Sequence, residues 1–65
     1  MQDEVSGRRL KAALGKKVEV IAFGITYAGT LKKIDQQAGT IRIEDRRDYA
    51  VLEIERIESF TVVSR

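Results

Sequence analysis

Residues 24–35, which read Gly-Ile-Thr-Tyr-Ala-Gly-Thr-Leu-Lys-Lys-Ile-Asp, decide the fold of this chain. Ile25, Tyr27 and Leu31 share one parity, as in a strand with one buried face. Gly29 interrupts the alternation, and an isolated glycine within a strand indicates a sharp bend or a bulge. We therefore expect a long bent strand over residues 25–34. A tight turn at residues 23–24 precedes it, and a turn over residues 35–39 follows it.

The flanking segments predict more strands and one helix. Alternating residues predict strands over 17–22, 40–44, 49–56 and 60–63, with residues 57–59 as a tight connection. Leu10, Ala13 and Leu14 have helical spacing, so a helix is expected over about 3–14, ending at Gly15. Short connections favour antiparallel neighbours, and five bent strands with one apolar face close into a small barrel. The expected fold is mainly β: one domain over residues 1–65, with a helix and then a five-stranded, strongly bent antiparallel barrel over about 17–63.

The composition excludes several classes of function. The chain has 65 residues with no cysteine, histidine, proline or tryptophan. Disulfides, metal sites built on cysteine or histidine, catalytic triads and thiol nucleophiles are therefore excluded, and we expect no enzymatic activity, no cofactor and no metal. No stretch approaches the roughly 20 apolar residues of a membrane span, and the acidic start at residues 1–4 is unlike a signal peptide. We therefore expect a cytoplasmic protein that does not contact a membrane.

The small size of the chain predicts self-association. A domain of this size buries only about 60% of its unfolded surface and is marginally stable alone. Small domains usually add disulfides, metals or oligomerisation, and the first two are not open to this composition. Residues 49–63 carry apolar side chains on both parities, which indicates burial on both faces or a partner along an edge. A monomer with a related small barrel is the alternative that this pattern disfavours.

Three segments of the chain resemble a known family. Residues 24–35 match the pattern G-x-x-x-x-G-x-L-x-x-apolar-D of the first Sm motif, and residues 14–20 match the usual entry from helix to strand. Residues 56–63 have the spacing of the second Sm motif. Over residues 8–63 the chain therefore resembles the Sm-like proteins (LSm and Hfq-type). This resemblance implies an SH3-like barrel in a homo-oligomeric ring of five to eight subunits. The fourth strand of one subunit would pair with the fifth of the next, with the seam near Leu52, Ile54, Phe60 and Val62.

The resemblance also implies binding of single-stranded RNA. Asp35 matches the acidic residue of the family's turn, and Gln36 resembles the second member of the Asp-Gln pair in the Hfq type. Arg56 stands where the second motif has its arginine. A basic cluster on the expected helix would attract phosphates, and it consists of Arg8, Arg9 and Lys11.

Two positions depart from the family pattern and keep a second hypothesis open. Gly39 occupies the asparagine position of the Sm-type turn, and Ile57 replaces the glycine of the second motif. The aromatic or histidine residue that stacks on a base is also missing. The first hypothesis is a ring-forming chaperone or scaffold that binds single-stranded RNA. The second is a ring-forming structural or protein-interaction module that has lost RNA binding.

Overall fold

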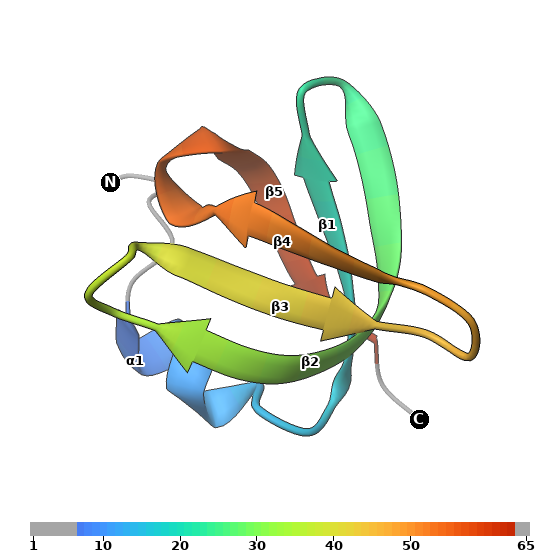
Figure 1. Ribbon diagram of the computed structural model, residues 1–65, viewed down its shortest axis with the longest axis horizontal. Coiled ribbons are helices and arrows are strands. Elements are labelled where there is room, and N and C mark those ends of the chain that lie inside the picture. The colour runs from blue at the N-terminus through green and yellow to red at the C-terminus, as the bar shows by residue number, and fades with distance from the viewer. Residues whose placement is uncertain (1–6, 64–65) are drawn as a thin grey trace.

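One short helix and one curved antiparallel sheet make up the protein (Figure 1). The computed structural model describes residues 7–63. The elements are α1 (Gly7–Ala12), β1 (Lys17–Ala22), β2 (Ile25–Asp35), β3 (Thr40–Glu44), β4 (Tyr49–Glu53), the 3-10 turn η1 (Ile54–Arg56) and β5 (Ile57–Val62). The five strands follow the order β4-β3-β2-β1-β5, so β5 crosses over to pair with β1. The expectation of a mainly β fold is confirmed. Within the described residues the sheet is not closed, and β4 and β5 are its two edges.

The bend in β2 lets one strand serve two partners. Residues 25–30 of β2 pair with β1, and residues 30–35 pair with β3, with a bulge between Leu31 and Lys33. A Cβ added to Gly29 would lie 2.6 Å from the backbone oxygen of Glu44 and 2.8 Å from Cγ2 of Ile43. These distances are too short for any real side chain, so only glycine allows β3 to pass this close. The close approach of β3 thus explains why glycine is required at position 29, and the irregularity of β2 that the sequence predicts near it lies between Leu31 and Lys33.

The core lies between the curved sheet and α1. Its buried side chains come from α1 and the segment that follows it, and from all five strands: Leu10, Ala13, Val18, Val20, Leu31, Ile41, Ile43, Leu52 and Phe60. Leu10 is the helical residue that packs into it most completely. The loop after the helix is hydrogen-bonded to the sheet. Gly15 donates its N–H to the carbonyl of Leu31 at 2.8 Å. The end of α1 is therefore fixed beside the middle of β2.

Three boundaries differ from the sequence expectation. The helix expected over 3–14 spans Gly7–Ala12, and residues 3–6 lie outside the described part of the chain. Ala13 and Leu14 continue only as a turn, through bonds to carbonyls three residues earlier. The strand expected over 49–56 ends at Glu53, because the chain turns into the 3-10 helix Ile54–Arg56. Residues 57–59, expected to be a connection, already belong to β5.

We predict that Gly29→Ala destabilises the protein by about 1–3 kcal/mol, because the new Cβ meets the backbone of β3 rather than a side chain that could move. The measurement is urea unfolding followed by circular dichroism. Gly39→Ala is the matched control: Gly39 has a φ of +71° but nothing within 4 Å of an added Cβ. It should lose about 1 kcal/mol from backbone conformation alone. An equal or smaller loss in Gly29→Ala would show that the close approach is not the constraint.

Candidate nucleic-acid interface

The end of α1 and the β2–β3 turn form a shallow depression. It is lined by Lys11, Leu14, Lys33, Ile34, Asp35, Gln36 and Gln37. Three of the residues predicted to bind RNA therefore come together here, namely Lys11, Asp35 and Gln36. Lysine ammonium groups bind phosphates, and glutamine amides offer both a donor and an acceptor to the edge of a base. The depression thus combines cationic side chains with side-chain amides.

Asp35 has a structural role in its own turn. Its Oδ1 accepts the N–H of Ala38 at 3.0 Å, and its backbone oxygen accepts the N–H of Gly39 at 2.8 Å. This is the local capping that aspartate commonly provides in turns. The turn uses Oδ1, so one carboxylate oxygen of Asp35 is committed to shaping the loop that carries Gln36 and Gln37.

The three arginines predicted to bind RNA lie in different environments. Arg8 is exposed on α1. Arg9 donates from Nη2 to the backbone oxygen of Phe60 at 2.8 Å, and its guanidinium lies 5.6 Å from the centre of the Phe60 ring. Arg56 donates from Nε to Oε1 of Glu53 at 3.3 Å and lies 5.9 Å from the ring of Phe23. Arg56 is therefore held against the β1–β2 turn and does not line the depression at Asp35.

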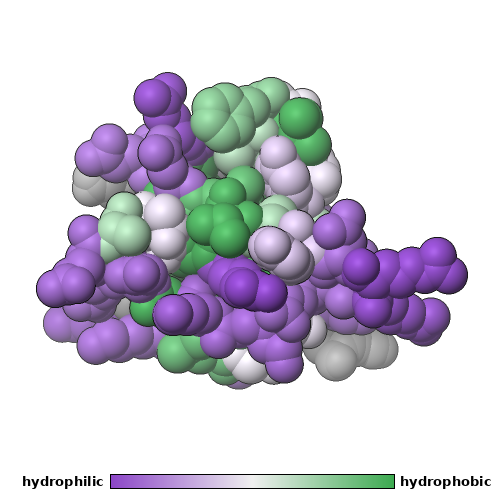
Figure 2. Space-filling model, viewed as in Figure 1, coloured by the Kyte–Doolittle hydropathy of each residue, from purple (hydrophilic) through white to green (hydrophobic). Residues whose placement is uncertain are grey.

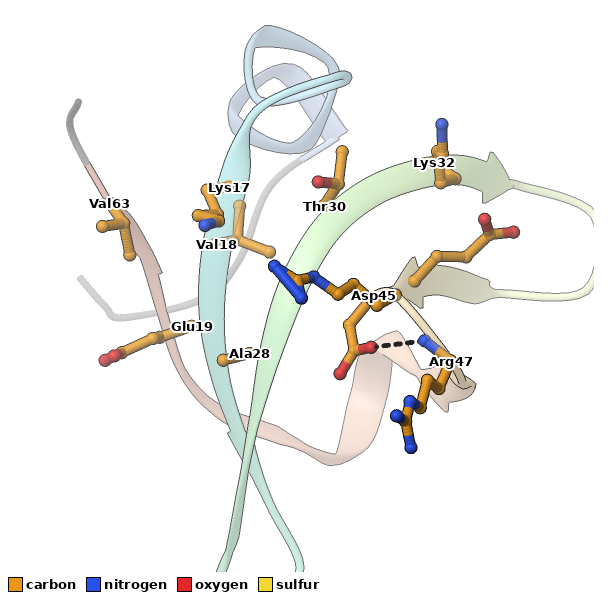
Figure 3. Close-up of a pocket in the computed structure, with 12 residues that line it drawn as sticks. Lys17, Val18, Glu19, Ala28, Thr30, Lys32, Asp45, Arg47 and Val63 are labelled. Atoms are coloured by element: carbon orange, nitrogen blue, oxygen red, sulfur yellow. Dashed lines mark hydrogen bonds between the residues drawn. The ribbon is translucent and has the colours of Figure 1, made fainter.

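A second and larger depression was missed by the sequence analysis. It lies where β1, the bend of β2 and the β3–β4 turn meet, and small residues at its base include Ala28, Gly29 and Thr30. Figure 3 shows Lys17, Glu19 and Val63 on one side of β2, and Asp45 and Arg47 on the other. Its charged lining consists of Lys17, Glu19, Lys32, Glu44, Asp45, Arg46 and Arg47. The charges are mixed, with four cations and three carboxylates, so the surface is only weakly basic.

Alternation alone could have located part of this second depression. Glu19, Ala28 and Thr30 all fall on the strand parity opposite the core, and Gly29 marks the bend beside them. The contribution of the β3–β4 turn to this depression could not be predicted from the sequence. It depends on where the end of β3 lies relative to the bend in β2. Asp45 fixes this turn by accepting the backbone N–H of Arg47 at 3.1 Å (Figure 3).

The residues predicted near a subunit seam divide into buried and exposed members. Leu52 and Phe60 are each only 4% exposed within the single chain, and Ile54 is half-buried. Val62 is 41% exposed. The sequence prediction omitted two edge residues of β4 that expose more apolar surface, Tyr49 at 57% and Val51 at 54%.

Apolar surface gathers in two places on the face seen in Figure 2. One lies over the β1–β2 turn, where Phe23 and Ile25 are exposed, and the other lies over β4 at the centre of the view. Phe23 adopts a positive φ of 57° in this turn, beside Gly24 at 72°. A two-residue turn with both φ angles positive matches the twist of a hairpin, so the strain at Phe23 accompanies a well-formed connection between β1 and β2.

Comparisons with known proteins give no match. No family model matches the chain, and neither a curated protein nor a solved structure is significantly similar to it. Within residues 7–63, no group of three or more carboxylates is arranged to hold a metal ion. Among the same residues, no helix has the length and apolar character needed to cross a membrane. The resemblance to Sm-like proteins therefore rests on the residues quoted above.

We predict that Asp35→Ala lowers the free energy of unfolding by about 1 kcal/mol, because the N–H of Ala38 loses its acceptor. Asp35→Asn keeps an oxygen at the same place and should lose less than half as much. Urea unfolding of both variants makes the measurement. Equal losses in the two variants would mean that the carboxylate charge, rather than the hydrogen bond, stabilises the turn.

Proposed function

We propose that this protein is an Sm-like subunit that assembles into a closed ring and binds single-stranded RNA. The observation that carries the proposal is the pair of free sheet edges. β4 and β5 are the two outer strands of one sheet, and both expose apolar side chains. Exposed strand edges with apolar side chains are sites where another strand adds. A second copy of the chain supplies such a strand without any further partner.

Antiparallel pairing of β4 with β5 of a neighbouring copy explains the exposed residues. Side chains of directly paired residues lie on the same face of an antiparallel ladder. Tyr49 and Val51 point outward from their own chain, whereas Phe60 and Val62 belong to the core-facing side of β5, opposite Val20 and Val18. In the proposed seam, Tyr49 and Val51 of one copy cover the core-facing side of β5 in the next. This burial includes Val62, which the single chain leaves 41% exposed.

This mode of pairing is compatible with a closed ring. The two edges differ, so each contact is head-to-tail, and repeated head-to-tail contacts form either a ring or a filament. The family resemblance favours a ring of five to eight subunits and a barrel-like curvature for each subunit. Closure also repeats the depression at Lys11 and Asp35 once per subunit. Weak contacts to one RNA strand then add through multivalency.

In this proposal, RNA binds to the depression at Lys11 and Asp35 and to the adjoining helix α1. The candidate RNA-binding residues are Arg8, Lys11, Asp35 and Gln36, together with Lys33 from the same surface. Arg9 and Arg56 each use one guanidinium nitrogen within the chain, on the Phe60 carbonyl and the Glu53 carboxylate, so part of their hydrogen-bonding capacity is already engaged. The contacts of these two arginines favour the second candidate function, a ring-forming structural or protein-interaction module without RNA binding.

We predict that the protein sediments as an assembly of five to eight subunits. Val51→Lys should weaken the assembly more than about tenfold, because a lysine on an edge strand disfavours pairing with another strand. Val51→Ile is the matched control and should assemble like the wild type, since it keeps the apolar branched side chain. The measurement is sedimentation velocity over a range of protein concentrations, with circular dichroism to verify folding. A wild-type mass that stays at one chain throughout would rule out the ring.

We predict that labelled oligouridylate or oligoadenylate binds and that affinity falls about tenfold or more between 50 and 200 mM salt, as phosphate contacts require. Lys11→Ala and Lys33→Ala should each weaken binding several-fold. Lys17→Ala, which changes the other depression by the same charge, is the control. If Lys17→Ala weakens binding equally, affinity follows total charge and the assignment to this depression is wrong. Ring assembly without binding at 50 mM salt would support the second candidate function.

A further inference from the structure

The hydrogen-bond pattern of β5 identifies which of its backbone groups face the free edge. Val63 donates its N–H to the carbonyl of Lys17 at 2.8 Å, so Lys17 and Val63 form a hydrogen-bonded pair. Bonded and non-bonded pairs alternate along an antiparallel ladder. Phe60, opposite Val20, is three residues from Val63 and therefore belongs to a non-bonded pair. The N–H and carbonyl groups of Phe60 thus point away from β1, toward the open edge.

Arg9 occupies this open edge. Its Nη2 donates to the outward carbonyl of Phe60 at 2.8 Å, and its guanidinium is 5.6 Å from the centre of the same residue's ring. The bond joins residues 51 positions apart, so it is a tertiary contact that α1 brings to β5. A charged side chain placed over a strand edge is one of the ways in which proteins protect such edges from pairing.

The edge of β4 carries a cap of the opposite charge. Asp45 donates its N–H to the carbonyl of Asp48 at 2.9 Å, which makes Asp45 and Asp48 a bonded pair and leaves Tyr49, opposite Glu44, in a non-bonded one. The N–H of Tyr49 therefore faces the free edge of β4. Oδ1 of Asp48 accepts this N–H at 2.8 Å. Each edge of the sheet thus has one backbone group bound by a charged side chain of the same chain.

The Phe60 carbonyl is needed for pairing between copies in every extended register. Over the regular part of the β1–β5 ladder the alternation leaves Phe60 and Val62 facing outward on β5, and over β4 it leaves Tyr49, Val51 and Glu53 facing outward. The register of β5 shifts beyond Ser59, so the regular outward set of this edge consists of Phe60 and Val62. Any antiparallel register that joins both of these residues to β4 of another copy therefore includes Phe60. The donor from the incoming β4 strand and the guanidinium of Arg9 then compete for one carbonyl.

We infer that Arg9 guards the β5 edge, and that a second copy of this chain pairs there only when Arg9 releases Phe60. This inference rests on the proposed edge-to-edge assembly and names the step that controls it. This guard, the hydrogen bond from Arg9 to the Phe60 carbonyl, sets the protein concentration at which chains associate. Arg9 is therefore assigned a role in assembly in addition to the contact to phosphate expected from the basic cluster on the helix.

The test compares the self-association of Arg9→Ala and Arg9→Met with that of the wild type by sedimentation velocity. Both variants remove the donor, and Arg9→Met retains an unbranched apolar stem that can pack on Phe60. We expect both to associate at about fivefold to tenfold lower protein concentration than the wild type. Lys16→Ala is the matched control, because it removes the same charge from an exposed residue just after α1, and it should self-associate at the same protein concentration as the wild type.

Three outcomes separate this inference from the proposed ring. If folded Arg9 variants associate at the same or a higher concentration than the wild type, the guard is refuted even if rings form. If the wild type stays monomeric and the Arg9 variants associate, the guard is supported and a constitutive ring is refuted. If all forms stay monomeric, both are refuted. Circular dichroism melting curves verify folding, and Arg9→Met provides the comparison if Arg9→Ala fails to fold.

Discussion

The close passage of β3 over Gly29 is the contact on which the rest of the structure depends. The backbone oxygen of Glu44 comes so near that no side chain fits at Gly29. This approach lets β2 bend, pair with β1 over its first half and pair with β3 over its second. The bend curves the sheet around Leu31, which is fully buried. A flat five-stranded sheet of this length would leave one whole face uncovered, with only a two-turn helix available to shield it.

In so small a protein, the same strands form the core of the single chain and the edges of the proposed pairing between copies. Leu52 and Phe60 already belong to the core of the single chain, so pairing between copies would add backbone hydrogen bonds and new apolar contacts without taking core residues away. The charged caps at Phe60 and Tyr49 work against that pairing. A chain whose edges were both apolar and uncapped would be prone to uncontrolled aggregation. In the proposed assembly, the balance between exposed valines and capping charges determines whether the chains remain separate.

The sequence predicts those features that depend on neighbouring residues. Gly29 predicts the bend, and the alternation over 40–44 matches β3 as observed. The predicted end of the strand over 49–56 was wrong because a 3-10 helix begins at Ile54, which the alternation of apolar residues does not signal. The contacts that Arg9 makes with Phe60 and Arg56 with Phe23 could not be read from the sequence. Their partners are defined only after α1 meets β5 and η1 meets the β1–β2 turn. Lys11, Asp35 and Gln36 line one depression, because the loop after α1 is fixed to β2 at Leu31.

The pairing of β1 with β5 has a consequence for the order in which contacts can form during folding. The β1–β2 hairpin closes through a local two-residue turn, whereas Val20 of β1 pairs with Phe60 of β5, far along the chain. Contacts between distant segments require a longer loop to close and form more slowly than local ones. Val18 and Val20 are fully buried in the folded chain, yet their strand gains its second neighbour only when this long loop has closed.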